Sequence, residues 1–551
     1  MLNPRTDRAG PVLAVLCVGA AALAWVNRFI QDDAFISLRY ARNLVDGSGL
    51  VWNPGGERVE GYTNFLWTLV LALPLKLGIN PYLFVSVLGA LMMPLTVLFT
   101  YRLAMTLFAN APVALIAALL LGTNYTFSCY ASGGLETHLQ ALLCTASLLL
   151  AAQCFAAGHG PSTARLLALS LVSALAVLTR LDSVLIVGLS VAVAAYAVVR
   201  AARSGSRLLL LSLPGVLIVG AWLAWKMQYY GELLPNTFYA KAAAKSLPVR
   251  GVFYLVSFLC SYLLAPSVAA ILFYVPRLRG VLGIPRTLLV LGVLTLWALY
   301  LVKVGGDFME FRFMVPALPL LMVLTAWVIV SAVRRPMWSA ALVTLLVAAS
   351  AVHAFSFNRS PLKRGLESIP DLKRNLRDPE YDWVGIGNYF HDAFASSKDK
   401  PIIAVTPAGA IPYYADLPAV DMLGLNDRWI ARHGAPLSDR PGHQKIATVK
   451  YLVDQGVTFV IGHPVVVTEN ARSPELDVRT YRDGVSVDEL KKMFVGKPVP
   501  DPGSLPENAK VALIPIAPGR HLIAIYLTPT PVWDEAIARL GWELVELKST
   551  P

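Results

Sequence analysis

The chain has 551 residues, of which 56% are apolar and 15% are charged. Soluble domains carry charge on about a quarter of their residues, so this composition excludes an ordinary soluble protein and predicts one that lies in a lipid bilayer. The net charge of +12 does not indicate nucleic-acid binding, because the basic residues fall in short clusters between apolar runs and form no stripe interleaved with aromatic residues.

Apolar stretches long enough to cross a membrane recur along the first two thirds of the chain. The first follows Arg5 and Arg8 and resembles a signal peptide, but it lacks a small-residue cleavage site, so we expect a retained helix. The run 64–77 contains Pro74 and Lys76 and is short for a span, which predicts a re-entrant or interfacial helix. About eleven spans are predicted, at residues 11–29, 81–104, 111–129, 138–157, 164–179, 183–200, 207–227, 252–275, 286–303, 312–333 and 337–355.

The basic residues predict the orientation of these spans. If the N-terminus is cytoplasmic and 64–77 does not cross, the loops that carry the other arginines face the cytoplasm too, as the positive-inside rule requires. These arginines are Arg165, Arg200, Arg203, Arg207, Arg277, Arg279, Arg286, Arg334 and Arg335. An odd number of spans then places the C-terminal part on the outer side of the membrane.

The composition changes after residue 356, where charges, Pro and Gly become frequent. Strand-like runs occupy 401–406, 458–462, 510–516 and 521–527, and helical spacing occurs at 381–395 and 534–540. We therefore expect a mostly α-helical polytopic membrane domain, residues 1–356, followed by an extracytoplasmic α/β domain, residues 357–551.

The sequence predicts no certain cofactor. The five cysteines lie in or beside apolar segments without metal-ligand spacing, so neither a disulfide framework nor a zinc site is expected. No glycine-rich nucleotide fingerprint occurs either. The adjacent Asp32 and Asp33 leave a divalent cation open, since carboxylate oxygens bind such ions.

Unusual polar residues gather in the loops predicted to face outside, which are 31–63, 132–137, 180–182, 228–250 and 305–311. In the first of them, Asp32 and Asp33 directly follow a span, and an acidic pair there is either a solvated flank or a functional site. A carboxylate beside cations can act as general base for an acceptor hydroxyl, while the cations stabilise a departing phosphate. The further candidates in and just after this loop are Arg39, Arg42, Glu57, Arg58, Glu60, Tyr62 and Asn64.

Two short outside loops add candidates for substrate binding. Glu136 and His138 either flank a span or line a polar site. Arg180 and Asp182 form either a surface ion pair of little energetic weight or part of the same site.

The last two outside loops offer partners for phosphate and sugar. Asn236 belongs to a turn, and Lys241, like Lys245, either anchors at the membrane surface or holds a lipid-linked phosphate as a point charge. Asp307, after a glycine pair that permits close backbone approach, is a candidate partner for a sugar hydroxyl. Arg312 can match two phosphate oxygens at once.

Several strings in these loops resemble one family of membrane enzymes. They are DDAFISLRYARNL, GERVEGYTNFLW, GGLET, LPNTFYAK, GGDFMEFRFMVPALP and, in the C-terminal part, AGAIPYYADLPAVDMLGLND. Together they resemble the GT-C superfamily of glycosyltransferases, and within it the bacterial terminal β-(1→2) arabinofuranosyltransferases and pilin arabinosyltransferases. The resemblance implies that Asp32 occupies the position of the catalytic aspartate, with Asp33 beside it. It also implies that Glu60 orients the sugar or the acceptor.

The resemblance further implies a GT-C fold and transfer of a sugar from a polyprenyl-phosphate donor at the outer face of the bacterial inner membrane. D-arabinofuranose is the implied sugar; mannose, glucose, galacturonic acid and aminoarabinose stay open, as does a glycan, lipopolysaccharide or pilin acceptor. One alternative is a transporter or flippase of lipid-linked sugars, with charges near the midplane of broken helices in pseudo-symmetric halves. The other is a C-terminal binding module with a membrane anchor, which would not need so many spans.

Overall fold

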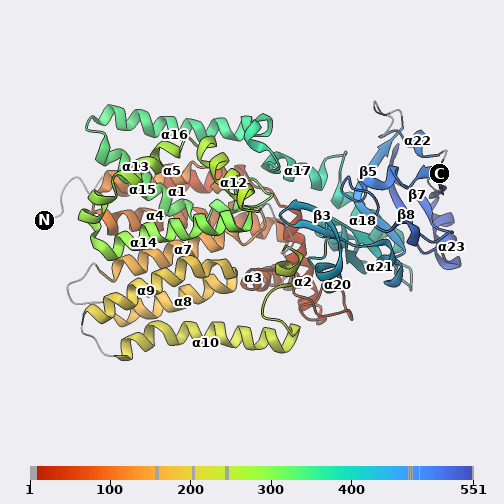
Figure 1. Ribbon diagram of the computed structural model, residues 1–551, viewed down its shortest axis with the longest axis horizontal. Coiled ribbons are helices and arrows are strands. Elements are labelled where there is room, and N and C mark those ends of the chain that lie inside the picture. The colour runs from red at the N-terminus through yellow and green to blue at the C-terminus, as the bar shows by residue number, and fades with distance from the viewer. Residues whose placement is uncertain are drawn as a thin grey trace.

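The computed structural model describes residues 9–155, 161–201, 205–241, 247–469, 471, 473, 476–482 and 484–548. Arg5, Arg8, Arg203 and Lys245, on which part of the sequence interpretation rests, lie outside these ranges. The described chain forms a bundle of apolar helices and a smaller part built around a β-sheet. The sheet part lies at one end of the bundle, and α1 (Ala9–Val26) begins near the other end (Figure 1).

Every predicted span coincides with a helix or a helix pair. After α1 these are α4 (Pro81–Phe108), α5 (Ala111–Gly122) with α6 (Tyr125–Ala131), α7 (Thr137–Gln153), α8 (Thr163–Thr179), α9 (Val184–Arg200), α10 (Gly205–Tyr230), α12 (Leu247–Ser261) with α13 (Ala265–Phe273), α14 (Val275–Val304), α15 (Leu318–Ala332) and α16 (Pro336–Ser356). These helices are apolar on all sides and lack a polar face that could contact water, so they fit a lipid bilayer.

The predicted number of eleven spans is not confirmed. Among the described residues six helices are long and apolar enough to cross a membrane, and at most eight if each bent pair counts as one span. The pair α5–α6 bends by 63° and the pair α12–α13 by 100°, whereas α8 and α15 are shorter apolar helices. Breaks and short helices therefore account for the difference.

The first outside loop and the run that follows it contain two helices, at the end of the bundle next to the C-terminal part. The helix α2 (Asp32–Val45), which the sequence interpretation did not predict, is capped by Gln31, whose side chain accepts a hydrogen bond from the Asp33 backbone N–H at 2.8 Å. The helix α3 (Phe65–Lys76) has 12 residues. Its length of about 18 Å is less than the roughly 30 Å of a hydrocarbon core, which agrees with the prediction that it does not cross.

The C-terminal part is an α/β structure, as predicted. Its described residues include a seven-stranded mixed sheet of order β2-β1-β5-β8-β7-β9-β6 and a separate hairpin of β3 and β4. The strands are β1 (Ile403–Val405), β2 (Ala419–Asp421), β3 (Ala435–Arg440), β4 (His443–Ile446), β5 (Phe459–Thr468), β6 (Val485–Ser486), β7 (Lys510–Ala517), β8 (Arg520–Tyr526) and β9 (Glu543–Lys548). The helices include α17 (Ile369–Arg377), α18 (Trp383–Phe394), α19 (Ala410–Ala415), α20 (Arg428–His433), α21 (Val449–Asp454), α22 (Val478–Arg482) and α23 (Pro531–Leu540).

The first loop and the C-terminal part share one hydrophobic core. Phe35, Tyr40 and Trp52 are buried in the same cluster as Ile403 and Phe459 of the sheet. The division at residues 356 and 357 follows the end of α16 and stays our proposed boundary. Because burial of such large side chains is strongly stabilising, the C-terminal part is fixed against the membrane domain rather than tethered to it.

Candidate functional site

Seven charged side chains lie together next to the C-terminal part, six of them from the five predicted outside loops and one directly after the last of these loops. They are Asp33, Glu136, Arg180, Asp182, Lys241, Asp307 and Arg312, and we name them the charged cluster. Arg180 pairs with Glu136 and with Asp182, each at 2.7 Å, and Arg312 pairs with Asp307 at 2.5 Å. The structure thus brings together residues of all five loops that the sequence analysis predicts to face outside.

Further hydrogen bonds hold the ion pairs of the cluster. The Asn64 side-chain amide donates to Glu136 at 2.7 Å, and Gln140 and the Tyr300 hydroxyl donate to Asp182 at 2.7 and 3.0 Å. Buried charges are costly unless they are paired and hydrogen-bonded. These partners fix Glu136 and Asp182 and consume most of their acceptor capacity, so both carboxylates stay in place when a substrate arrives.

Asp33 and Lys241 differ from the other five members of the cluster, which form ion pairs with one another. Within the part of the chain that the structure describes, neither forms an ion pair, although the Gln31 side chain interacts with the Asp33 carboxylate. Burial raises the pKa of Asp33, while the charges of Arg312 and Lys241 act against this rise. Desolvation and the nearby Arg312 lower the pKa of Lys241. A carboxylate that can accept a proton and a cation outside any described ion pair therefore lie close enough to affect each other's charge.

Asp32 faces a different partner from its neighbour. Its buried carboxylate accepts hydrogen bonds from the backbone N–H groups of Ala410 at 2.7 Å and Gly409 at 3.2 Å, both in the C-terminal part. A Cβ atom on Gly409 would lie 2.0 Å from the Asp32 carbonyl oxygen, so glycine is required for this approach. Burial raises the pKa of Asp32 to about 7, against the effect of the two N–H groups. The adjacent aspartates therefore do not converge on one point.

The described part of the chain holds no ready-made metal site. Among the described residues, no group of three or more His, Cys, Asp or Glu side chains is arranged to hold a metal ion.

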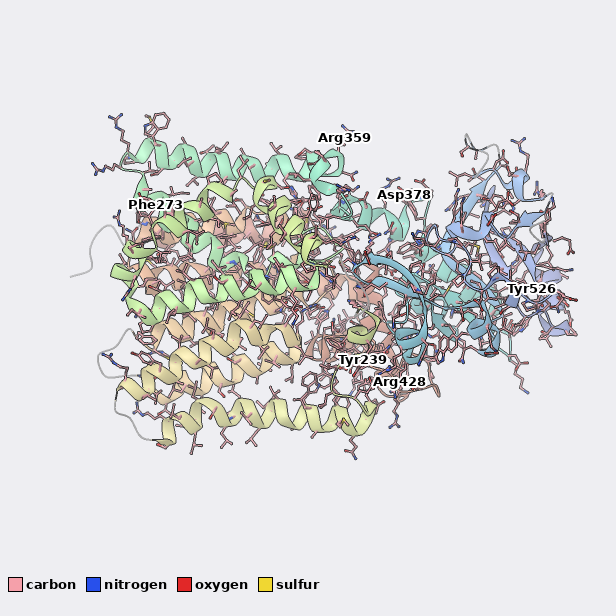
Figure 2. The ribbon with its side chains drawn as sticks, in the orientation of Figure 1. Tyr239, Phe273, Arg359, Asp378, Arg428 and Tyr526 are labelled. Atoms are coloured by element: carbon pink, nitrogen blue, oxygen red, sulfur yellow. The ribbon has the colours of Figure 1, made fainter. Side chains whose placement is uncertain are left out.

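Two other predicted site residues join the membrane domain to the C-terminal part. The Arg39 guanidinium is buried and donates to the carbonyls of Trp52 and Leu417, each at 2.8 Å, and to that of Pro412. The Asn236 amide donates to three carbonyls of residues 424–427, among them Gly424 at 2.9 Å. Because backbone carbonyls accept these hydrogen bonds, both side chains link the membrane domain to the C-terminal part and are not free to bind a substrate. Figure 2 shows Tyr239 and Arg428 at this junction.

Glu60, Tyr62 and Arg58 lie outside the charged cluster. Glu60 is buried and pairs with Lys226 at 2.6 Å, and burial raises its pKa to about 7 although Lys226 lowers it. The Tyr62 hydroxyl lies 3.0 Å from that of Tyr230. Arg58 is exposed, with its guanidinium 4.5 Å from the centre of the Tyr229 ring. These groups lie near the interface between the membrane domain and the C-terminal part.

His138 is also separate from the cluster. It is buried, and its ring packs on that of Phe127 with 4.4 Å between centroids. Neither ring nitrogen has a hydrogen-bond partner among the described residues. Its surroundings are those of a core side chain.

The sequence interpretation missed the contribution of the β3–β4 hairpin. His443 packs edge-on against Phe308 with 5.3 Å between ring centroids, and Arg440 pairs with Glu367. The signal available in the sequence was the dipeptide Pro441–Gly442, which marks a tight turn beside a lone histidine. Nothing local to that segment indicates that the turn reaches the membrane domain.

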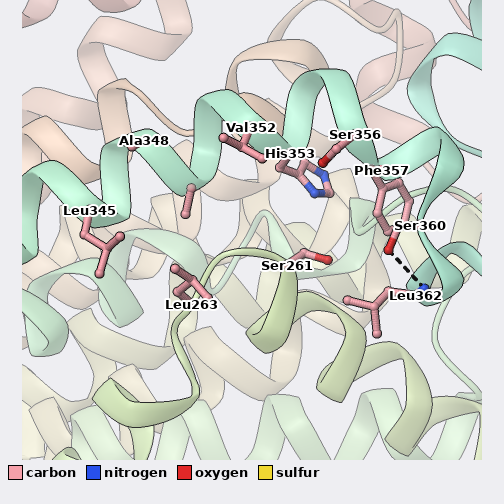
Figure 3. Close-up of a pocket in the computed structure, with 11 residues that line it drawn as sticks. Ser261, Leu263, Leu345, Ala348, Val352, His353, Ser356, Phe357, Ser360 and Leu362 are labelled. Atoms are coloured by element: carbon pink, nitrogen blue, oxygen red, sulfur yellow. Dashed lines mark hydrogen bonds between the residues drawn. The ribbon is translucent and has the colours of Figure 1, made fainter.

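An apolar cavity of about 330 Å³ lies between α16 and the α12–α13 bend (Figure 3). Its lining comes from the α12–α13 bend, α16 and the segment after α16, and comprises Ser261, Leu263, Leu345, Ala348, Ala349, Val352, His353, Ser356, Phe357, Ser360 and Leu362. The Nε2 atom of His353, one of these residues, lies 2.8 Å from a carboxylate oxygen of Glu310, which precedes Arg312 of the cluster by two residues.

The fold defines the class of protein. ArnT from Cupriavidus metallidurans in the apo state matches with a TM-score of 0.55 and 13% identity, over 95% of this chain and 98% of that one. The archaeal oligosaccharyltransferase AglB from Archaeoglobus fulgidus, in complex with an inhibitory peptide and a dolichol-phosphate, matches with a TM-score of 0.50 and 12% identity, over 96% and 75%. The protein is therefore a multi-pass membrane protein with the GT-C fold.

Sequence comparison gives a narrower similarity. The chain is 32% identical over 326 residues to a terminal β-(1→2)-arabinofuranosyltransferase of Mycobacterium tuberculosis, covering 52% of this chain and 51% of that protein. A protein of the same name from Corynebacterium glutamicum is 28% identical over 367 residues, covering 57% and 50%. The chain thus spans about half the length of the curated relatives it matches. Residues 374–502 match a family model described as a domain of unknown function, DUF8728. The resemblance read from the loop motifs is confirmed.

Proposed function

We propose that the protein transfers a sugar, D-arabinofuranose, from a polyprenyl-phosphate donor to a cell-envelope glycan or glycoprotein at the outer face of the bacterial inner membrane. The observation that carries this proposal is that the Asp33 carboxylate and the Lys241 ammonium, neither in an ion pair among the described residues, act on each other's charge within a network of fixed ion pairs. In such a pair the carboxylate can accept a proton while the ammonium stabilises the negative charge that develops on a leaving phosphate.

The geometry supports a displacement at the anomeric carbon. Asp33 accepts the proton of the acceptor hydroxyl, whose oxygen forms the new bond to the anomeric carbon. The bond from that carbon to the phosphate oxygen breaks, and the lipid phosphate leaves with the electron pair. Lys241 and Arg312 meet the charge that develops on the phosphate, which lipid alone would solvate poorly. Asp32 positions this arrangement through its hydrogen bonds to Gly409 and Ala410.

The comparisons support the donor and the sugar. A crystal structure of ArnT from Cupriavidus metallidurans was obtained bound to undecaprenyl phosphate, with a TM-score of 0.51 to this chain, and AglB was obtained with a dolichol-phosphate. The names of the two curated relatives specify an arabinofuranosyl group. A transporter is less well supported, because the charged cluster lies in loops at the end of the bundle and not at the α5–α6 or α12–α13 bends.

The direct test follows the donor in cells and in liposomes. Cells that lack the protein should accumulate the polyprenyl-phosphate sugar that it consumes, and mass spectrometry of the lipid identifies the sugar. The reconstituted protein should transfer that sugar to an envelope-glycan acceptor. Unchanged lipid-linked sugars in the deletion strain, together with no transfer in liposomes, would contradict the proposal.

The orientation predicts opposite labelling at the two ends of the bundle. In a variant whose native cysteines are replaced by Ala, Ser48→Cys should react with a membrane-impermeant maleimide added to intact spheroplasts. Arg335→Cys should react after lysis alone. Both positions are exposed, so burial does not confound the result. Labelling of Arg335→Cys in intact spheroplasts would invert the proposed topology.

The cavity beside α16 gives a separate prediction for the lipid chain of the donor. Its apolar walls suit the first isoprenoid units of a lipid whose phosphate lies at the charged cluster. Ala348→Phe should raise the KM for the donor about fourfold, the effect of losing roughly one buried methylene contact, without changing the acceptor KM. Ala341→Phe, at an exposed position of α16 outside the cavity, is the control. Equal donor KM values for the two variants would argue against lipid in this cavity.

A further inference from the structure

The β3–β4 hairpin of the C-terminal part reaches the charged cluster. It is a two-stranded unit separate from the main sheet, and it lies on the side of the C-terminal part that faces the helix bundle (Figure 1). At its turn, a Cβ atom on Gly442 would lie 3.8 Å from the Phe308 ring and 3.9 Å from Cε of Lys241. The turn therefore closely approaches two of the loops that form the cluster.

One residue, Glu367, ties the hairpin to the loop of Asp307 and Arg312. Its carboxylate pairs with Arg440 of β3, whose guanidinium also lies 5.2 Å from the centre of the Phe308 ring. Its backbone N–H donates to the Phe308 carbonyl at 2.7 Å, and its carbonyl accepts from the Glu310 N–H at 2.9 Å. The hairpin is thus held in a fixed position relative to the charged cluster.

His443, directly after the turn, is a neutral hydrogen-bonding group beside Lys241. Desolvation, and then the nearby charges of Arg440 and Lys241, lower its pKa to about 3, so the imidazole is uncharged at neutral pH. Its Nδ1 lies 3.3 Å from the Pro441 carbonyl. This contact assigns the proton to Nδ1 and leaves Nε2 as an acceptor. Within the described part of the chain, Nε2 has no hydrogen-bond partner.

We propose that His443 is a substrate-binding residue supplied by the C-terminal domain, and that its Nε2 accepts a hydrogen bond from a hydroxyl group of the donor sugar. The inference rests on the proposed function, in which Lys241 meets the donor phosphate. Because the sugar is bonded to that phosphate, a group beside Lys241 lies where the sugar must be. Both parts of the chain then contribute to the active site. The membrane domain supplies the charged groups, and the hairpin supplies a hydrogen-bond acceptor that recognises the sugar.

The test measures transfer with donor and acceptor concentrations varied separately. His443→Ala should raise the donor KM about three- to tenfold, as expected for one lost neutral hydrogen bond, and leave the acceptor KM unchanged. His443→Gln should restore most of the donor affinity, because its side-chain oxygen can replace the Nε2 acceptor. His391→Ala, at an exposed histidine of α18 in the same domain, should match the wild type.

A binding measurement separates this inference from the proposed function. His443→Ala should weaken binding of the sugar-bearing lipid but not of polyprenyl phosphate, which lacks the sugar. Equal affinity of wild type and His443→Ala for the sugar-bearing lipid would overturn the role of His443 and leave the proposed function standing. Weakened binding of both lipids would also overturn it, since the hairpin would then act on the phosphate. A wild type that neither binds nor transfers the lipid-linked sugar would refute the proposed function itself.

Discussion

Replacing Asp33 by Asn is expected to lower the rate of sugar transfer about a hundred- to ten-thousandfold, the usual contribution of a general base. The amide keeps the size of the side chain but cannot take the acceptor proton. Asp33 forms no ion pair in the described part of the structure, so the substitution breaks no bridge that supports the fold. The variant should therefore appear in the membrane at normal levels with an unchanged Tm.

The matched substitution Asp32→Asn separates the two aspartates. It replaces one of the two acceptor oxygens facing Gly409 and Ala410 by an amide donor, so the contact with the C-terminal part weakens. We expect reduced transfer accompanied by a lower Tm and faster proteolysis of the C-terminal part. If Asp32→Asn abolishes transfer with an unchanged Tm while Asp33→Asn transfers normally, Asp32 is the base, as the family resemblance implies, and our assignment is wrong.

The pH dependence provides an independent check on Asp33. A base works in its deprotonated form, so the rate should fall as the pH decreases through its pKa. Burial raises that pKa above the ordinary 3.8, so the acidic limb should begin at a higher pH than for an exposed aspartate. The limb should be missing from the residual activity of Asp33→Asn.

Removing the cations is expected to affect use of the donor much more than use of the acceptor. Lys241→Ala should lower kcat/KM for the donor about ten- to a hundredfold, since hydrogen bonds to charged groups contribute about 1.5 to 3 kcal/mol. Arg312→Ala should cost at least as much, because it also leaves Asp307 buried without its partner at 2.5 Å. Steady-state kinetics with each substrate varied in turn is the measurement.

Lys303→Ala is the control for these cation variants. Lys303 is exposed at the C-terminal end of α14 and lies outside the charged cluster, so its removal should change neither donor nor acceptor kinetics. Unchanged donor dependence in both Lys241→Ala and Arg312→Ala would mean that the phosphate is held elsewhere. The remaining arginines of the first loop would then be the groups to replace.

The sequence by itself determined where the apolar helices lie, which loops gather the polar residues, and six elements of the C-terminal domain, namely β1, β5, β7, β8, α18 and α23. Hydropathy over about twenty residues is a local property, so every predicted span coincides with a helix or a helix pair. The strand-like runs likewise became β1, β5, β7 and β8. The clustering of Glu136, Arg180, Lys241 and Arg312 followed from placing all polar loops on one side of the membrane.

The tertiary structure decided which polar residues are free. Successive residues of a helix point about 100° apart, so Asp32 and Asp33, at the start of α2, cannot face one partner. Asp32 meets Gly409 across 377 positions of sequence, and Arg39 and Asn236 are likewise occupied by C-terminal carbonyls. No local pattern encodes such contacts, because they depend on how closely two distant backbones approach. For the same reason the sequence did not predict a role for His443, because His443 comes near Lys241 only through the packing of the C-terminal domain on the membrane domain.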